Sequence, residues 1–266
     1  MLVKRTITAI LLFCVLLLVL WSNQFFPSFT ITVSLCALIC GFEFFRMVSS
    51  SGKGRPATWL GLVLIILFVF SPIFNWLEDN SLIYGLVLVL PLIWVLLRRD
   101  KSGALTGWAF TIAGILYLGW TASRYTSLIQ LDHGQNWIIF ALFCAFASDT
   151  LAYVVGRLMG KHKLAPTISP AKTWEGAIGG FIGAIIIGSI TAWILELPLS
   201  FWQAIILTGI TSIFVQFGDL AESLFKRNLS LKDSGTALPG HGGLLDRVDG
   251  IIFAGVVVYY YVVWIV

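Results

Sequence analysis

Long apolar segments separated by short polar stretches run through most of the chain. A helix needs roughly 20 mostly apolar residues to cross the hydrocarbon of a bilayer. By this measure we predict about nine membrane-spanning helices, near residues 6–22, 29–48, 57–76, 81–98, 104–122, 136–157, 175–195, 201–222 and 250–266. The first segment follows Lys4 and Arg5 but lacks a small-residue cleavage site, so we read it as a retained helix rather than a signal peptide. The expected fold is therefore all-α and polytopic.

Composition supports this interpretation. The 266 residues are 58% hydrophobic and only 11% charged, whereas a soluble domain is about 25% charged. A soluble fold is therefore excluded. The net charge of +4 comes from basic loops and does not indicate a nucleic-acid partner.

The basic residues also predict the orientation of the helices. If the N-terminus is cytoplasmic, the nine-helix arrangement places all but one of the 17 Lys and Arg residues on the cytoplasmic side, with Arg124 as the exception. Cytoplasmic loops of membrane proteins are enriched in these residues. We therefore expect an N-in, C-out topology.

Two cytoplasmic loops are long and rich in polar side chains, at 158–174 and 223–249. We expect residues 1–135 to form a transmembrane helical scaffold. Residues 136–266 would form a catalytic region that carries both loops.

The second loop combines acids and bases in a spacing that suits a metal–phosphate site. Asp219, Glu222, Ser223 and Lys226 fall on one face of a helix. Further along the chain, Asp246 and Asp249 flank Arg247 and follow a glycine-rich run around His241. Mg²⁺ takes carboxylate oxygens from a protein and the rest of its ligands from water and phosphates. Asp219, Asp246 and Asp249 suit that demand, and the basic side chains suit the phosphates.

The first loop and its flanking helices supply a second set of polar residues. Ser169 or Thr173 could cap a helix beginning near residue 174, and Lys172 would add positive charge at that end, where anions are favoured. A capped helix with an ordinary cytoplasmic lysine is the simpler alternative. Asp149 lies inside the sixth apolar segment, where a carboxylate is costly and usually functional. An interhelical ion pair would also explain it.

Taken together, these residues form a recognisable signature. Ser223-x-Phe-Lys226-Arg227, then Lys232-Asp233-x-Gly, then Leu-Pro-x-His241-Gly242-Gly243-Leu-x-Asp246-Arg247-Val-Asp249 resembles the signature of the CDP-diacylglycerol synthases, or phosphatidate cytidylyltransferases. The upstream segments Ser-Asp149-Thr and Ser169-Pro-x-Lys172-Thr-Trp-Glu175-Gly are similar to that family too. The specific likeness covers about residues 148–250, because the N-terminal helices carry no diagnostic motif.

The resemblance implies a membrane nucleotidyltransferase that makes CDP-diacylglycerol and pyrophosphate from CTP and phosphatidic acid. It implies Mg²⁺, with a monovalent cation such as K⁺ beside it, a homodimer, and a bacterial inner membrane with the site facing the cytoplasm. The expected metal ligands are Asp219, Asp246 and Asp249. The other expected catalytic residues are Lys226, Lys232, Arg247 and His241. The expected substrate-binding residues are Asp149, Ser169, Lys172, Glu175, Ser223, Arg227, Asp233, Gly242 and Gly243.

Two other functions remain open from the residues alone. A transporter could use Asp149, Asp219 and Glu43 as coupling-ion sites, although the polar residues gather in two loops on the same side. A related enzyme could use CTP on another lipid phosphate, or transfer only a phosphate from it.

Overall fold

A computed structural model describes residues 19, 27–74, 81–231, 233–235 and 242–266. Of the first predicted segment, 6–22, only Val19 is among them. Lys232 and His241, both expected in the site, lie outside the described residues.

The described chain is mostly helical, which confirms the expected class. Its elements are α2 (Ser28–Ser50), α3 (Thr58–Phe70), the short 3₁₀ turn η1 (Ser71–Ile73), α4 (Ser81–Leu97), α5 (Ala104–Gly114), the π-helical segment η3 (Ile115–Trp120), α6 (Thr121–Leu128), α7 (Gly134–Met159), β1 (Lys163–Ala165), β2 (Ser169–Thr173), α8 (Trp174–Ile194), α9 (Phe201–Asn228) and α10 (Leu245–Ile265). Eight of the nine predicted apolar segments thus correspond to helices or continuous helical stretches in the described part of the chain.

Within the described residues, six helices are long and apolar enough to cross a membrane. They are α2, the continuous stretch Ala104–Leu128, α7, α8, α9 and α10. The apolar segments Thr58–Ile73 and Ser81–Leu97 are shorter. The protein is therefore an integral membrane protein, and the full count of nine helices and their orientation stay predictions.

The first long loop departs from the all-α expectation. Its strands β1 and β2 form an antiparallel hairpin in which Lys163 lies opposite Thr173 and Ala165 opposite Ser169. Open strand edges of such a hairpin are tolerated outside the hydrocarbon of a membrane, where water satisfies them. The hairpin was not predicted, because strands of only three and five residues leave too short a pattern in the sequence.

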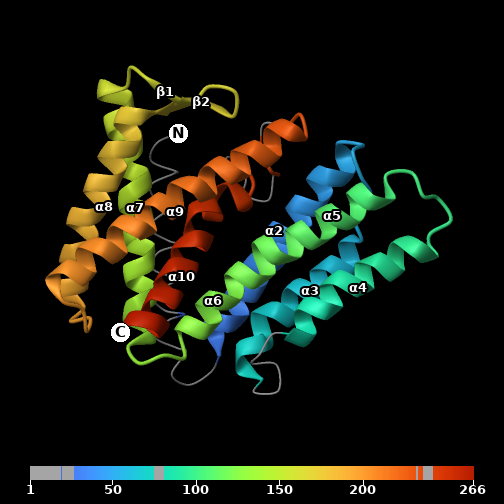
Figure 1. Ribbon diagram of the computed structural model, residues 1–266, viewed down its shortest axis with the longest axis horizontal. Coiled ribbons are helices and arrows are strands. Elements are labelled where there is room, and N and C mark those ends of the chain that lie inside the picture. The colour runs from blue at the N-terminus through green and yellow to red at the C-terminus, as the bar shows by residue number, and fades with distance from the viewer. Residues whose placement is uncertain (1–18, 20–26, 75–80, 232, 236–241) are drawn as a thin grey trace.

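Figure 1 shows α7 and α8 side by side on one flank of the molecule, with α9 and α10 between them and the group formed by α2 to α6. Small residues let α7 and α8 approach closely. A Cβ at Gly180 of α8 would lie 2.6 Å from the carbonyl oxygen of Ser148 in α7. Close backbone approach at small residues is a usual way for membrane helices to associate, because lipid gives no hydrophobic drive between them.

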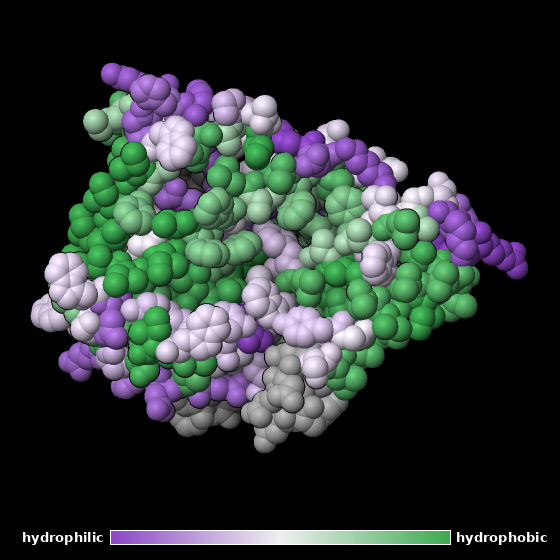
Figure 2. All heavy atoms as spheres, in the orientation of Figure 1, coloured by the Kyte–Doolittle hydropathy of each residue, from purple (hydrophilic) through white to green (hydrophobic). Residues whose placement is uncertain are grey.

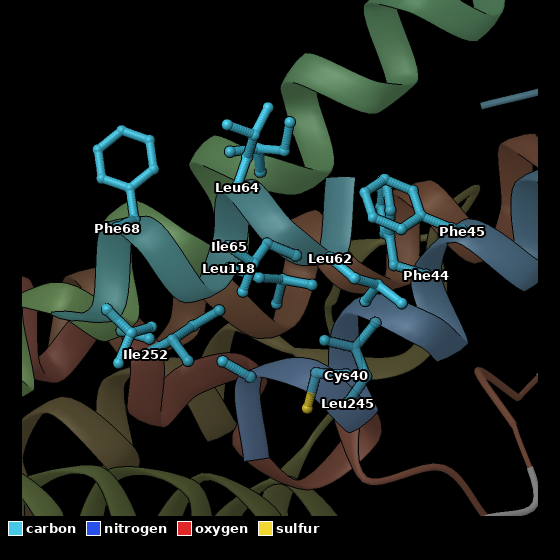
Figure 3. Close-up of a cluster of buried hydrophobic side chains, with 14 of the residues drawn as sticks. Cys40, Phe44, Phe45, Leu62, Leu64, Ile65, Phe68, Leu118, Leu245 and Ile252 are labelled. Carbon is cyan, nitrogen blue, oxygen red and sulfur yellow. The ribbon is translucent and has the colours of Figure 1, made fainter. Parts of the chain in front are cut away.

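A buried apolar cluster joins the last helix to the N-terminal group. Phe44 and Phe45 of α2, Ile65 and Phe68 of α3, and Leu245 of α10 belong to it, and each is fully buried. Figure 3 shows how side chains from α2, α3, η3 and α10 converge there. The start of α10 is therefore fixed by residues that lie some two hundred positions earlier in the chain.

The outer surface suits contact with lipid. Figure 2 shows wide apolar areas on the lateral face, with polar side chains gathered toward the ends of the helices. Large apolar side chains such as Trp59 and Leu97 are strongly exposed on this surface. In a soluble protein such areas would promote association, whereas a bilayer covers them.

Candidate active site

Three acids and one lysine from four separate elements lie near one another toward the end of the molecule that carries the hairpin. Asp149 comes from α7, Lys172 from β2, Asp219 from α9 and Asp249 from α10. The Lys172 Nζ lies 2.6 Å from Asp219 Oδ2. Asp149, Asp219 and Asp249 are near enough to repel one another electrostatically and to be attracted by Lys172. We call these four residues the acidic cluster.

The close crossing of α9 and α10 brings the cluster together. A Cβ at Gly218 would lie 2.5 Å from the carbonyl oxygen of Asp249, so only glycine allows this approach. A hydrogen bond of 2.8 Å between the hydroxyls of Ser148 and Ser212 fixes α7 against α9 on the other side. Asp149 and Asp219 follow next to these contact points in their helices and are held near each other by them.

The carboxylates of the cluster differ in access. Asp249 is buried and accepts a hydrogen bond of 2.8 Å from the Gly250 N–H. The Asp219 side chain is 37% exposed, and Asp149 is also exposed. The cluster therefore has one buried wall and an open side on which a ligand could approach.

A second group of charged residues lies further along α9 and at the start of α10. The Lys226 Nζ lies 2.7 Å from Glu222 Oε2 and 2.6 Å from Asp246 Oδ1. Asp246 Oδ2 accepts hydrogen bonds from the Ser234 N–H and hydroxyl and from the Gly243 N–H, at 3.0, 2.9 and 3.1 Å. We call Glu222, Lys226 and Asp246 the lysine group. Asp246 thereby holds the loop that precedes α10.

The hairpin is held in place by Glu175 and Arg227, which we predicted to bind substrate, and by the helix cap Thr173. Thr173 is the N-cap of α8 and accepts a hydrogen bond of 3.2 Å from the Gly176 N–H, which confirms one of the two predicted caps. Glu175 accepts from the backbone N–H groups of Lys161 and His162 and lies 2.6 Å from His162 Nδ1. Arg227 Nε donates to the Ile168 carbonyl at 3.2 Å. These contacts fix the strand that carries Lys172 over α9.

The remaining predicted residues lie around these groups. Ser169 is paired within the hairpin, Ser223 lies half-buried on α9, and Asp233 is exposed next to Ser234. Gly242 takes a positive φ of 83° and Gly243 is buried against Ser234. Arg247 is exposed in the first turn of α10. Asp246 and Asp249 thus lie within a helix, although we had expected both in the loop that precedes it.

The acidic cluster suits a divalent cation in its net negative charge and in the oxygen donors that it offers. With Lys172, the three carboxylates carry a formal charge of −2, and carboxylate oxygens are what Mg²⁺ prefers. Among the residues that the structure describes, no three His, Cys, Asp or Glu side chains are close enough together to form a ready-made metal site. Asp246 is engaged in the lysine group by its contact with Lys226.

Sequence reasoning gave no enzymatic role to two residues near the site. Glu43 of α2 is buried and reaches the loop before α10. Tyr117 lies in the π-helical segment η3, and its buried hydroxyl is near Asp249 and Glu222, with no hydrogen-bond partner among the described residues. Glu43 is a lone acid in a predicted apolar segment, and this feature of the sequence could have marked it as a residue with a specific role. No feature of the sequence predicted the π-helical segment η3, which determines where the Tyr117 side chain points.

Known proteins resemble the chain over nearly its whole length. The chain matches the cytidylyltransferase family over residues 3–265. It is 36% identical over 251 residues to a protein of Staphylococcus haemolyticus named phosphatidate cytidylyltransferase, covering 94% of both chains. Proteins of the same name from Bacillus subtilis and Brucella abortus are 33% and 36% identical, covering 87% and 96% of this chain and 87% and 91% of theirs.

The chain therefore belongs to the cytidylyltransferase family and is a nucleotidyltransferase of the membrane. This confirms the resemblance seen in the residue 148–250 signature. The match also extends over the N-terminal helices, where the sequence itself carried no diagnostic motif.

Proposed function

We propose that this protein transfers the cytidylyl group of CTP to phosphatidate, giving CDP-diacylglycerol and pyrophosphate. The observation that carries the proposal is the convergence of Asp149, Lys172, Asp219 and Asp249 from four elements, beside the lysine group. Its close relatives bear the name of this activity over nearly their whole length.

The chemistry follows from the charges of the two substrates. A phosphatidate oxygen attacks the α-phosphorus of CTP in line with the departing pyrophosphate. The new P–O bond forms as the bond to the β-phosphate oxygen breaks, and the electron pair leaves with pyrophosphate. Phosphatidate is already an anion, so no strong base is needed. The main obstacle is repulsion between two anions, and preorganised positive groups reduce it.

The lysines supply this positive charge from fixed positions. The ion pair with Asp219 orients Lys172, and Glu222 and Asp246 orient Lys226 from two sides. A lysine held in one place stabilises developing charge without reorganising during the reaction. We propose that Lys172 and Lys226 contact the phosphates of the substrates, together with Arg247 and the two predicted residues outside the described chain, Lys232 and His241.

Mg²⁺ is the cofactor we propose, held by Asp219 and Asp249, with Asp246 as the third predicted ligand and K⁺ as a neighbouring ion. When bound, a divalent cation would neutralise phosphate charge and stabilise the leaving pyrophosphate. Asp219 is the partly exposed member of this set, so we expect it to have the largest share in binding the ion.

The location of the site fits one soluble and one lipid substrate. We propose that the end of the molecule with the hairpin faces the cytoplasm, where CTP is available, in the inner membrane of a bacterium. Phosphatidate would present its headgroup there while its acyl chains stay in the leaflet. A homodimer, which the family resemblance implies, completes the proposal.

A labelling experiment with the purified protein tests the reaction directly. CTP carrying ³²P at the α-position is expected to label a phosphatidate-derived lipid, whereas CTP labelled at the γ-position is expected to leave the lipid unlabelled and release labelled pyrophosphate. Lipid labelled from the γ-position would show a CTP-dependent kinase instead. No lipid labelling from either CTP, with phosphatidate and Mg²⁺ present, would contradict the proposal. A parallel assay with an ether-lipid phosphate as the acceptor tests whether the protein prefers phosphatidate.

A further inference from the structure

A buried acid in the N-terminal group of helices reaches the site region, although it lies outside the family signature. Glu43 belongs to α2, lies between apolar neighbours in the sequence, and is only 5% exposed. A carboxylate buried in an apolar helix is costly unless it has hydrogen-bond partners. Its partners therefore indicate why it is there.

Glu43 contacts the beginning of α10 with both carboxylate oxygens. Its Oε1 accepts from the Leu244 N–H at 3.1 Å, and its Oε2 accepts from the Leu245 N–H at 2.9 Å. The N-cap residue of α10 is Leu244, which provides no side-chain cap of its own. The first N–H groups of a helix lack partners within that helix and favour negative charge. Glu43 therefore caps α10 from a different helix.

The loop before α10 is fitted tightly around the same carboxylate. The Ser234 hydroxyl lies 3.5 Å from Glu43 Oε2. A Cβ at Gly235 would lie 2.6 Å from Glu43 Oε1, and one at Gly243 would lie 2.8 Å from Oε2 and collide with the Ser234 hydroxyl. A side chain at either position would therefore displace the Glu43 carboxylate or the loop, because the backbone passes directly over Glu43.

Glu43 and Asp246 hold this loop from two sides. The Ser234 hydroxyl donates to Asp246 Oδ2 at 2.9 Å and lies 3.5 Å from Glu43 Oε2, so it is placed between the two carboxylates. Gly243 donates to Asp246, and the next two N–H groups donate to Glu43. Asp246 in turn holds Lys226 at 2.6 Å. A chain of direct contacts thus runs from α2 to the lysine that we propose for phosphate binding.

From this geometry we infer that Glu43 is a positioning residue of the catalytic site. Glu43 caps α10 from α2 and thereby fixes where the first turn of α10 places the Asp246 side chain. Asp246 in turn fixes the position of the Lys226 side chain. The inference rests on the proposed cytidylyltransferase reaction, because Lys226 and Asp246 have their role in that reaction.

Glu43→Gln is the first variant to measure, because it keeps the size of the side chain and removes its charge. We expect kcat to fall about tenfold, as for the loss of one charge-assisted hydrogen bond, with the KM for CTP changed less than twofold. Glu43→Ala is expected to lower kcat further, and Glu43→Asp, which keeps the carboxylate, is expected to retain more activity than Glu43→Ala. Ser34→Ala is the matched control, since Ser34 is buried in the same helix and its hydroxyl donates to the Thr30 carbonyl one turn earlier.

The thermal midpoint of each variant in detergent separates positioning from folding. The inference is supported if Glu43→Gln loses activity while its midpoint stays within a few degrees of the parent protein. A double-mutant cycle of Glu43→Gln and Ser234→Ala adds a second measurement. We expect their effects on kcat to be non-additive, because both residues act on the same loop. The inference is overturned if Glu43→Gln and Glu43→Ala keep at least half of the parent kcat, or if their activity falls only in step with the folded fraction.

The parent protein in the same assay keeps the two proposals apart. If the parent transfers no cytidylyl group to phosphatidate, the proposed function fails whatever the variants do. If the parent is active and the Glu43 variants are equally active, the reaction stands and only the role of Glu43 is refuted.

Discussion

At the scale of single residues, the site separates acids that are accessible from acids that hold the protein together. Asp219 has one lysine partner and a partly exposed side chain. Asp246 is engaged by Lys226 and by three donors from the loop before α10. A substitution at Asp246 therefore alters chemistry and loop structure together, whereas a substitution at Asp219 mainly alters chemistry.

Asp219→Asn is accordingly the sharper test of the acidic cluster. We expect cytidylyl transfer to fall at least about a hundredfold, the size seen when a key electrostatic group is removed. The loss in stability should stay below about 1 kcal/mol, because the pair with Lys172 is partly exposed and removing the Asp219 charge relieves its repulsion with Asp149 and Asp249. Activity and the thermal midpoint in detergent are the two measurements.

Asp132→Asn is a suitable control for that experiment, since Asp132 is an exposed acid in the connection between α6 and α7. It should keep the activity of the parent protein. Near-normal activity of Asp219→Asn at saturating Mg²⁺ would remove Asp219 from the proposed metal ligands.

At the scale of elements, the hydrophobic pattern predicted that the helices exist but placed some of their polar ends several residues away from where they lie. The apolar segment predicted at 201–222 continues as α9 to Asn228, and the one predicted at 250–266 begins as α10 at Leu245. A hydropathy criterion ends where charge begins, but a helix continues past the bilayer wherever its charged residues have partners. Lys226, Glu222 and Asp246 are such partners.

The candidate site could be predicted in its members but not in its arrangement. The sequence pointed to Asp219, Lys226, Asp246 and Asp249, because their types and spacing suit phosphate chemistry. Their division into an acidic cluster and a lysine group depends on the crossing of α9 and α10 and on contacts from the hairpin and α2. Those contacts join residues far apart in the chain, and one sequence carries no signal for them.

The close packing of α7 and α8 gives a prediction at this scale. Gly180→Ala should destabilise the protein by about 1–3 kcal/mol, the usual cost of inserting a group where there is no space. The physical reason is the Ser148 carbonyl, which lies 2.6 Å from where the new Cβ would be. Thermal or denaturant unfolding in detergent would measure the effect.

Gly85→Ala provides the matched comparison for this prediction. Gly85 lies in α4, and a Cβ there would meet no atom within 4 Å. Alanine favours a helix over glycine by up to about 1 kcal/mol, so this variant should be as stable as the parent or slightly more so. Equal effects of the two substitutions would contradict the packing argument.

At the scale of the whole molecule, the charged residues of the candidate site lie toward one end of the body, the end that carries the hairpin. Figure 1 shows the hairpin and the C-terminal ends of α2 and α9 toward the same end. The connections between α6 and α7 and between α8 and α9 lie toward the opposite end. This polarity agrees with the basic residues in the sequence and gives a direct test of orientation.

Single cysteines at the two ends should react from opposite sides of the membrane. We expect Ser230→Cys, at the end of α9, to react with an impermeant thiol reagent only in inverted vesicles. Asp132→Cys should react in intact cells. Both positions are exposed, whereas Cys40 and Cys144 are buried. The parent protein measures the background, and labelling of both variants from one side would refute the proposed topology.

The cap that α2 supplies to α10 has a consequence for biosynthesis. Because α2 is translated first, Glu43 enters the bilayer long before the backbone N–H groups that donate to it are synthesised. Until Leu244 and Leu245 emerge, the nascent protein carries an acid in an early helix without those partners. Premature termination upstream of α10 would therefore leave an unstable polypeptide, which quality-control proteases could recognise by that orphaned acid.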